Sequence, residues 1–282
     1  MSDIVYKNFR FSTPFLRGYR VLRIPIVDSA GRPAWPELFP LERIDALRQT
    51  VGPRHFSSQM MLEFVPIDRA RLDPDALGLY SDEFDARSAK IGDNQITGVA
   101  AYWDPSGGRR GADGSVCVIL YRNDKTHHVF VHDVMYLTVP DGTLHPLGYQ
   151  CDMIIDFLAR YHLHRVYIET NGIGNALPEI MRDVATRRNT TINVQNVINN
   201  QNKETRILDA IEPLLGTGRL HMHTRVQQTP MISEMIGWSP VRCAGHDDGL
   251  DALAGAICAA PTPIRPIGAL PPSFSANTNF RI

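Results

Sequence analysis

The chain has 282 residues, 43% of them hydrophobic and 21% charged, which is the composition of a soluble globular protein with one large domain or two small ones. Its 29 Lys and Arg against 30 Asp and Glu leave a net charge of −1, which excludes a globally basic nucleic-acid binder but allows a local basic groove. No apolar run of about 18 residues and no secretory leader occur, so no membrane association is expected. The cysteines form no CxxC pair, which favours a reducing, cytoplasmic compartment over a disulfide framework or a zinc site.

Residues 1–90 are rich in Arg, Pro and Phe, and their strand signals are weak. VLRIPIV at 21–27 is compatible with one strand. The apolar spacing of 41–52, closed by a glycine, predicts a helix, and 55–66 reads as a second helix or a mixed segment. We therefore expect an arm or linker here rather than a complete domain.

Strand and helix signals alternate from residue 95 onward. Strands are predicted at 95–103, 114–122, 127–137, 164–170, 191–197 and 219–223, and helices at 147–162, 175–188, 202–218, 228–236 and 245–260. This order predicts an α/β fold, in which helices cover both faces of a mixed sheet and the first three strands are antiparallel. Residues 261–282 hold five prolines and no acids, so we expect a flexible, Pro-rich tail.

Acidic side chains stand at the ends of three predicted elements. Asp104 follows the first strand in AAYWDPSGG, and Glu169 ends a buried strand in RVYIETNG. Asp247, Asp248 and Asp251 open the last helix in HDDGLDALAGAI. If the first and fourth strands are neighbours, Asp104 and Glu169 meet at one sheet edge, and a helix packed across that edge brings its first turn close to both. Asp248 and Asp251 are three residues apart and share one helix face.

Carboxylates gathered in this way repel one another unless a cation neutralises them, and hard oxygen ligands suit Mg²⁺ or Mn²⁺. Two such ions, about 3.5–4 Å apart, can clamp the attacking water and the leaving oxygen of a phosphodiester. Each acid also has a structural interpretation: Asp104 as a turn residue, Asp247 as a helix N-cap, and Asp248 as a partner of the helix dipole. Glu169 and Asp251 are harder to explain structurally, because their neighbours in the sequence are apolar.

This order of acids resembles that of RNase H-like nucleases of the resolvase and integrase type. More narrowly, it resembles the C-terminal nuclease domain of the large terminase subunit of tailed bacteriophages. NKETRILDAIEPLLGTGRLHMH is similar to that family's Lys-containing helix followed by a Gly-Arg strand, and residues 32–66 resemble the stretch that joins the ATPase to the nuclease. The resemblance covers about residues 20–260. It implies an RNase H-like nuclease domain over 91–260, preceded by a linker or arm at 1–90 and followed by the tail at 261–282.

The resemblance also implies a site. Asp104, Glu169, Asp248 and Asp251 would be the catalytic acids and would bind two Mg²⁺ or Mn²⁺ ions; the pattern D-x-x-D-A-L-A matches the end of related resolvases. Which of Asp247, Asp248 and Asp251 binds metal stays open. No GxxxxGK[ST] motif occurs, so no ATP site is assigned, and we expect a nuclease portion without the packaging ATPase.

Several basic residues are candidates for phosphate contacts, which would make DNA binding salt-sensitive. They are Lys203 and Arg206 on a predicted helix, and Arg109 and Arg110 in a Gly-rich loop after Asp104. For the helix pair, a solvated surface is the alternative interpretation. The family resemblance implies double-stranded DNA as the substrate, and a small terminase subunit, a portal and a packaging ATPase domain as partners, in the cytoplasm of a host cell.

The predicted function is a metal-dependent DNA endonuclease that cuts concatemeric viral DNA during genome packaging by two-metal hydrolysis. Two alternatives stay open. One is a Holliday-junction resolvase or transposase-like nuclease with the same acidic core, which a junction-selectivity assay would separate. The other is a non-catalytic module that docks on a portal or capsid, in which the acids only cap a helix; it predicts neither metal binding nor cleavage.

Overall fold

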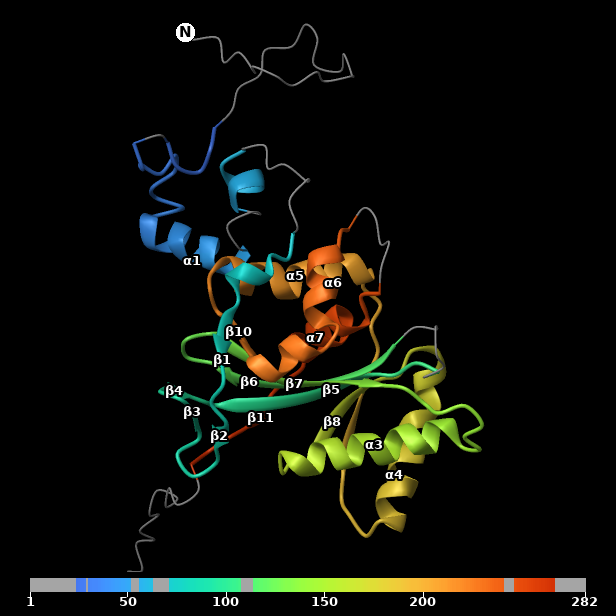
Figure 1. The fold of residues 1–282 in the computed structure, drawn as a ribbon. Helices are drawn as coiled ribbons and strands as arrows, with labels where there is room; N and C mark the ends of the chain where they lie inside the picture. The colour runs from blue at the N-terminus through green and yellow to red at the C-terminus, as the bar shows by residue number, and fades with distance from the viewer. Residues whose placement is uncertain are drawn as a thin grey trace, which may run out of the picture.

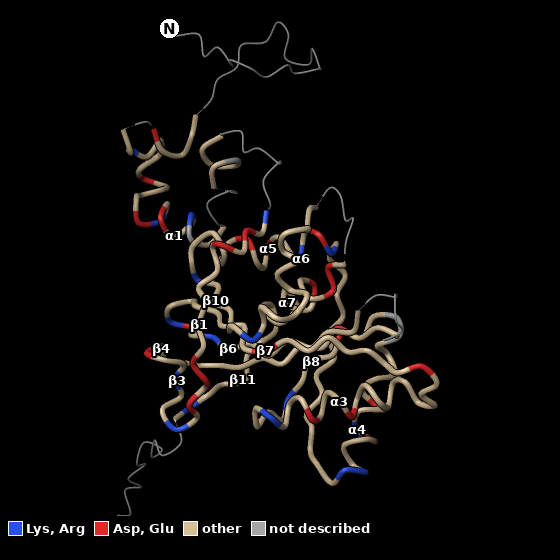
Figure 2. The backbone as a smooth tube through the Cα atoms, viewed as in Figure 1, with Lys and Arg blue, Asp and Glu red and all other residues tan. Residues whose placement is uncertain are grey.

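A computed structural model describes residues 24–28, 30–51, 56–62, 71–107, 114–240 and 246–266 (Figure 1). Arg109, Arg110 and most of the predicted tail lie outside these residues. No helix in the described part is long and apolar enough to cross a membrane. Figure 2 shows Lys and Arg at several separate places on the described fold, not in one continuous stripe.

The main sheet has the strand order β1-β10-β7-β6-β5-β8-β9, with β11 paired to β5. Its strands are β1 (Gly78–Tyr80), β5 (Gly98–Asp104), β6 (Ser115–Asn123), β7 (His128–Leu137), β8 (Arg165–Glu169), β9 (Asn193–Val197), β10 (Leu220–His223) and β11 (Thr262–Pro263). The antiparallel meander β5-β6-β7 is confirmed, and β8, β9 and β10 each pair in parallel with a neighbour. The predicted mixed sheet of an α/β fold is therefore confirmed.

Helices cover both faces of this sheet (Figure 1). Helices α5 (Lys203–Gly216), α6 (Met231–Gly237) and α7 (Asp248–Cys258) lie on one face, and α3 (Pro146–Arg160) and α4 (Leu177–Arg187) lie on the other. Helix α1 (Leu41–Val51) lies further out, beside α5. Single turns of other helix types are η2 (Phe56–Met60), η3 (Pro74–Ala76), η4 (Gly172–Ala176) and η5 (Thr224–Gln228).

Alternation along the central strands supplies two hydrophobic cores. Val116 and Val118 on β6 point into the core under α5, α6 and α7, whereas Cys117 and Ile119 point into the core under α3 and α4. Both faces of the strand are covered, so β6 is apolar almost throughout. Trp103 is fully buried in the second core, where it packs among apolar side chains.

Helix α7 packs directly on β5, and Gly255 permits the close approach. A Cβ at Gly255 would lie 2.3 Å from ring carbons of Tyr102. The helix runs over β5 and β6, and its first turn comes to the edge where β5 ends. The acidic start of α7 is therefore carried to the carboxyl end of the central strands.

Two segments near the N-terminus differ from the sequence-based expectation. Segment 21–27 is described from Ile24 onward and contributes an isolated bridge between Val27 and Pro33 rather than a strand. The segment 55–66, expected to be a second helix or a mixed segment, is described only as the π-helical turn η2 and the two residues after it.

Four short strands between residues 78 and 95 were not predicted. β1 joins the main sheet beside β10, while β2 (Phe84–Asp85), β3 (Lys90–Ile91) and β4 (Asn94–Gln95) form a small separate sheet. The first residues of the expected tail pair with β5 as β11, so they are part of the sheet. The proposed domain boundaries at 90 and 260 stay predictions.

Candidate active site

Parallel pairing of β5 and β8 brings Asp104 and Glu169 to the same sheet edge. Tyr102 pairs with Tyr167 and Trp103 with Ile168, so the next residues along the two strands are Asp104 and Glu169. Because side chains alternate along a strand, Asp104 shares the face of Tyr102, which packs under α7. The prediction that the first and fourth strands are neighbours in the sheet is confirmed.

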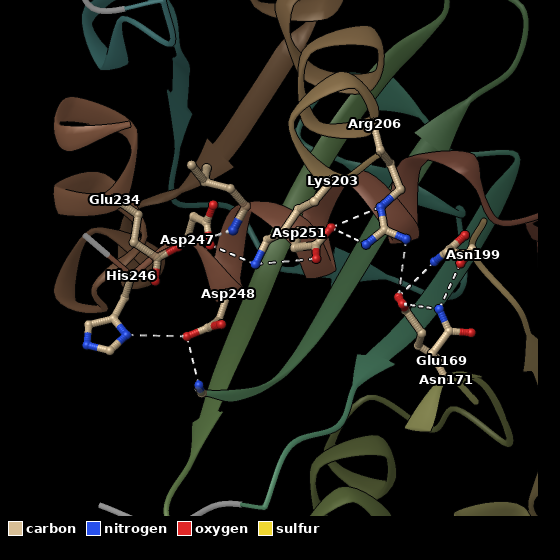
Figure 3. A network of polar contacts seen from close by, with 12 residues as sticks. Glu169, Asn171, Asn199, Lys203, Arg206, Glu234, His246, Asp247, Asp248 and Asp251 are labelled. Atoms are coloured by element: carbon tan, nitrogen blue, oxygen red, sulfur yellow. Dashed lines mark hydrogen bonds and ion pairs between the residues drawn. The ribbon is translucent and has the colours of Figure 1, made fainter. Parts of the chain in front are cut away.

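Glu169 is held by a set of hydrogen-bond donors (Figure 3). Its carboxylate is buried, and Oε2 accepts hydrogen bonds from the Tyr102 hydroxyl at 2.8 Å and from Asn199 Nδ2 at 2.7 Å. Oε1 accepts a longer hydrogen bond from Asn171 Nδ2 at 3.3 Å. These contacts fix the carboxylate in one orientation at the end of β8.

The first turn of α7 presents two buried carboxylates to different partners. Asp248 Oδ2 accepts a hydrogen bond from the Gly114 amide at 2.7 Å, and His246 Nδ1 lies 3.7 Å from the same oxygen. Asp251 Oδ1 accepts one from Arg206 Nε at 2.9 Å and also contacts Nη2. The three-residue spacing places both acids at the site, but each has its own set of contacts.

Two cations on α5 connect the acids. Lys203 Nζ lies 2.7 Å from Asp247 Oδ1 and 3.5 Å from Asp251 Oδ2, and Arg206 Nη1 lies 3.4 Å from Glu169 Oε2. Burial works to lower the pKa of both cations, but the adjacent carboxylates raise it above the ordinary value, so both stay charged.

Lys203 and Arg206, both predicted to contact phosphates, differ in how accessible their side chains are. Arg206 is only 6% exposed, so the structure places it as an internal partner of Asp251 and Glu169 rather than on a DNA-facing surface. The Lys203 side chain is 36% exposed and lines the pocket described next. Lys203 is therefore the member of the pair that a phosphate can reach in this conformation.

Among the described residues, no side chain of opposite charge lies within hydrogen-bonding distance of the Asp104 carboxylate. Withdrawal from water raises the pKa of Asp104 to about 8; the charges of Glu169 and Asp251 act in the same direction, while Lys203 and Arg206 oppose them. The carboxylate lines a pocket of about 240 Å³. The lining residues are Asp104, Pro105, Ser106, Gly114, Lys203, His246, Asp247 and Asp248.

The donor set of this pocket fits a hard cation. No group of three or more His, Cys, Asp or Glu side chains in the described part of the chain is already arranged around a metal position. Asp104 and Asp248 nevertheless face one pocket, where withdrawal from water and the charges of Glu169 and Asp251 disfavour the ionised form of Asp104. Carboxylate oxygens are the ligands that Mg²⁺ and Mn²⁺ prefer, and a bound cation would relieve the repulsion.

Sequence reasoning missed the residues that hold Glu169. Asn171 and Asn199 both come just after neighbouring strands, β8 and β9, so polar residues at strand ends were a usable signal. Tyr102 offered none, because a tyrosine inside an apolar strand is usually a core residue.

Comparison with known proteins gives one family match and several similar folds. Residues 103–220 match the family described as Terminase Bacteriophage T7, Ribonuclease H-like domain. No curated protein matches the sequence.

Three of the similar solved structures are viral nuclease domains. The nuclease domain of the P22 large terminase is 10% identical with a TM-score of 0.47, covering 66% of this chain and 89% of that chain. The human cytomegalovirus terminase nuclease domain, Mn soaked and inhibitor bound, is 14% identical with a TM-score of 0.45, covering 68% and 93%. The nuclease domain of the large terminase subunit of bacterial virus Sf6 is 14% identical with a TM-score of 0.44, covering 69% and 99%.

Proposed function

We propose that this chain, whose residues 103–220 are a ribonuclease H-like domain of the terminase family, is a metal-dependent endodeoxyribonuclease that cuts concatemeric viral DNA during genome packaging. The observation that carries the proposal is the Asp104 carboxylate, which lies in one pocket with Asp248 and has no cation paired to it among the described residues. A partly buried acid with a strongly raised pKa at the end of a central strand is typical of a functional site.

Asp104 and Asp248 form the open part of the proposed ligand set, which Glu169 and Asp251 complete for two Mg²⁺ or Mn²⁺ ions. When bound, such ions lower the pKa of a coordinated water and neutralise charge on the phosphodiester. Glu169 and Asp251 already share Arg206, so their oxygens are the more strongly engaged members of the set. Asp104 is therefore the acid whose loss we expect to matter most.

The chain's own residues supply orientation and a phosphate contact. The Gly114 amide fixes Asp248, and Tyr102 and Asn199 fix Glu169. Arg206 contacts both Glu169 and Asp251, and its charge opposes the burial that raises the pKa of Asp251. Lys203 lies at the pocket with a partly exposed side chain, so we assign it the contact with the DNA backbone near the cut. Arg109 and Arg110 stay candidates for the same role.

The proposed biological setting rests on the family match. Double-stranded DNA is the proposed substrate, in the cytoplasm of an infected cell. A small terminase subunit, a portal and a packaging ATPase domain are the proposed partners, and sequence choice would come from them. The ATPase would translocate DNA, and this domain would cut it at the start and end of packaging.

A plasmid-nicking assay tests the proposal. Supercoiled plasmid is incubated with the wild type or Asp104→Asn in Mn²⁺, Mg²⁺ or EDTA. We expect cleavage by the wild type with metal, none in EDTA, and none by the folded variant. Wild-type protein that is folded but neither binds metal nor cuts would overturn the proposal in favour of a docking module. Strong preference for a four-way junction over linear duplex would favour a resolvase.

A further inference from the structure

Glu234 is a buried acid to which the proposed reaction gives no role. It lies on α6, and its Oε2 accepts a hydrogen bond from the Leu250 amide at 3.1 Å (Figure 3). The Gly249 amide donates to the same carboxylate. Amides in the first turn of a helix have no acceptor within that helix. Glu234 therefore supplies, from a different helix, the acceptor that the start of α7 lacks.

Asp247 occupies the N-cap position of α7, but its side chain does not accept hydrogen bonds from the first-turn amides. It instead pairs with Lys203 at 2.7 Å. The interpretation of Asp247 as the residue that caps the helix is thus corrected: the position is right, but the capping carboxylate belongs to Glu234. The division of roles leaves Asp247 to hold Lys203 at the pocket.

Gly249 makes this arrangement possible. A Cβ at this position would lie 1.9 Å from the Tyr136 hydroxyl and 2.8 Å from Glu234 Oε2. Only glycine lets Tyr136 of β7 and Glu234 of α6 both approach the first turn of α7. Three elements therefore meet at the residue that directly follows Asp248.

We propose that Glu234 is a positioning residue for the acidic site: it holds the first turn of α7 so that Asp248 faces the pocket of Asp104. This inference rests on the proposed function. Asp248 is then fixed twice, through the backbone amides that follow it and through its own carboxylate, which the Gly114 amide contacts at 2.7 Å. Partners that orient a metal ligand commonly change metal affinity about 10–100-fold when they are removed.

Amide hydrogen exchange in the metal-free protein tests the contact itself. The amides of Gly249 and Leu250 are followed by NMR in the wild type, Glu234→Ala and Glu234→Gln. We expect exchange at least about tenfold faster in the alanine variant, and near wild type in the glutamine variant, whose side-chain oxygen still accepts. Val184→Ala is the matched control, because this side chain is buried on α4 beneath the other sheet face. It should leave the relative protection of these two amides unchanged.

Mn²⁺ binding, measured by calorimetry on the same variants, tests the consequence. We expect about 10–100-fold weaker binding in Glu234→Ala and restoration in Glu234→Gln. Wild-type exchange and binding in Glu234→Ala, or losses no larger than those of Val184→Ala, would overturn the proposal. If Glu234→Ala does not fold, unprotected Gly249 and Leu250 amides in the wild type overturn it, and protected amides with intact Mn²⁺ binding in Glu234→Gln support it. A wild type that binds no Mn²⁺ would instead refute the proposed function, while the exchange comparison would still decide whether Glu234 holds this turn.

Discussion

Two clusters of ionisable side chains lie on the same sheet, and they differ in how completely they are paired. The first is the acidic site at the ends of β5 and β8. The second lies where β7 meets β10 and is built around buried His132, whose Nδ1 is 3.1 Å from the Tyr80 hydroxyl and whose Nε2 is 3.2 Å from Glu83 Oε2. Arg225 completes it by contacting Glu83, His223 and the Tyr161 hydroxyl.

The pKa directions follow this difference. Burial lowers the pKa of His132 to about 4, with Arg225 acting in the same direction, so the ring is neutral at physiological pH and its two nitrogens are satisfied by polar neighbours. Asp104, by contrast, has a pKa raised to about 8 and no cation paired to it in the described structure. Stability alone explains a cluster whose polar groups all pair with one another, whereas an acid without a paired cation supports the proposed cation site.

The largest expected effect is on catalysis. Asp104→Asn should lower the rate of Mn²⁺-dependent plasmid nicking on the order of 10³-fold or more, because a lost metal ligand removes several kcal/mol of charge stabilisation. Its melting temperature should stay equal to that of the wild type or rise, because the variant removes a partly buried acid whose ionised form the fold disfavours. A variant that cuts normally would place the reaction elsewhere.

The second effect is on stability within the acidic site itself. Arg206→Ala leaves Glu169 and Asp251 buried without their shared cation, so we expect a loss of about 3–5 kcal/mol in the free energy of unfolding. Lys203→Ala, on the preceding turn of α5, is the control. Its side chain is partly exposed, and the loss should be below about 1 kcal/mol. Urea denaturation measures both, and equal losses would contradict the assignment of Arg206 as the internal partner.

The third effect tests the paired cluster. Arg225→Ala removes contacts to Glu83, His223 and Tyr161 and should cost about 1–2 kcal/mol of stability while nicking at a permissive temperature stays within about twofold of the wild type. This pattern is the reverse of that expected for Asp104→Asn. If Arg225→Ala abolished cleavage while the protein stayed folded, the paired cluster would have a functional role after all.

The fourth effect is the pH dependence of stability in EDTA. The pKa of Asp104 is raised from 3.8 in the unfolded chain to about 8 in the fold, so the folded state binds the proton more tightly between these values. This contribution to the stability of the wild type is therefore lost as pH rises from about 4 to about 8. The stability of Asp104→Asn relative to wild type should increase over the same range and level off above it. A difference that does not depend on pH would show that Asp104 is ionised throughout.

The smallest expected effect concerns His246. Its side chain is 72% exposed, and its Nδ1 lies 3.7 Å from Asp248 Oδ2. His246→Ala should change the free energy of unfolding by less than about 0.5 kcal/mol. Thermal melts and nicking rates measured together would show whether it also acts on the substrate; a drop in rate at unchanged stability would add His246 to the proposed site.

The part of the fold that follows from local pattern was predictable. The strands and helices from β5 to α7 have clear periodicity, and their order predicts that Asp104, Glu169 and the start of α7 come together, as they do. The strands β1 to β4 and β11 have two or three residues each. At that length no periodicity exists, and their existence depends on partners far away in the chain.

The contacts within the site were less predictable for the same reason. Helical spacing places Lys203 and Arg206 on α5 but does not say that Arg206 turns inward to Asp251. Nor does any local signal connect Glu234 with the first turn of α7, since a buried acid on a short helix has no sequence signature. Residue types therefore indicated the chemistry, whereas the pairing of individual charges required the three-dimensional structure.

The most direct test of the central claim is a calorimetric titration of Mn²⁺ into metal-free wild type, Asp104→Asn and Arg225→Ala. We predict that the wild type and Arg225→Ala bind alike, and that Asp104→Asn binds at least about tenfold more weakly, because the carboxylate without a counterion is the one that receives the cation. Equal Mn²⁺ affinity in all three proteins, or no binding by a folded wild type, would contradict the account.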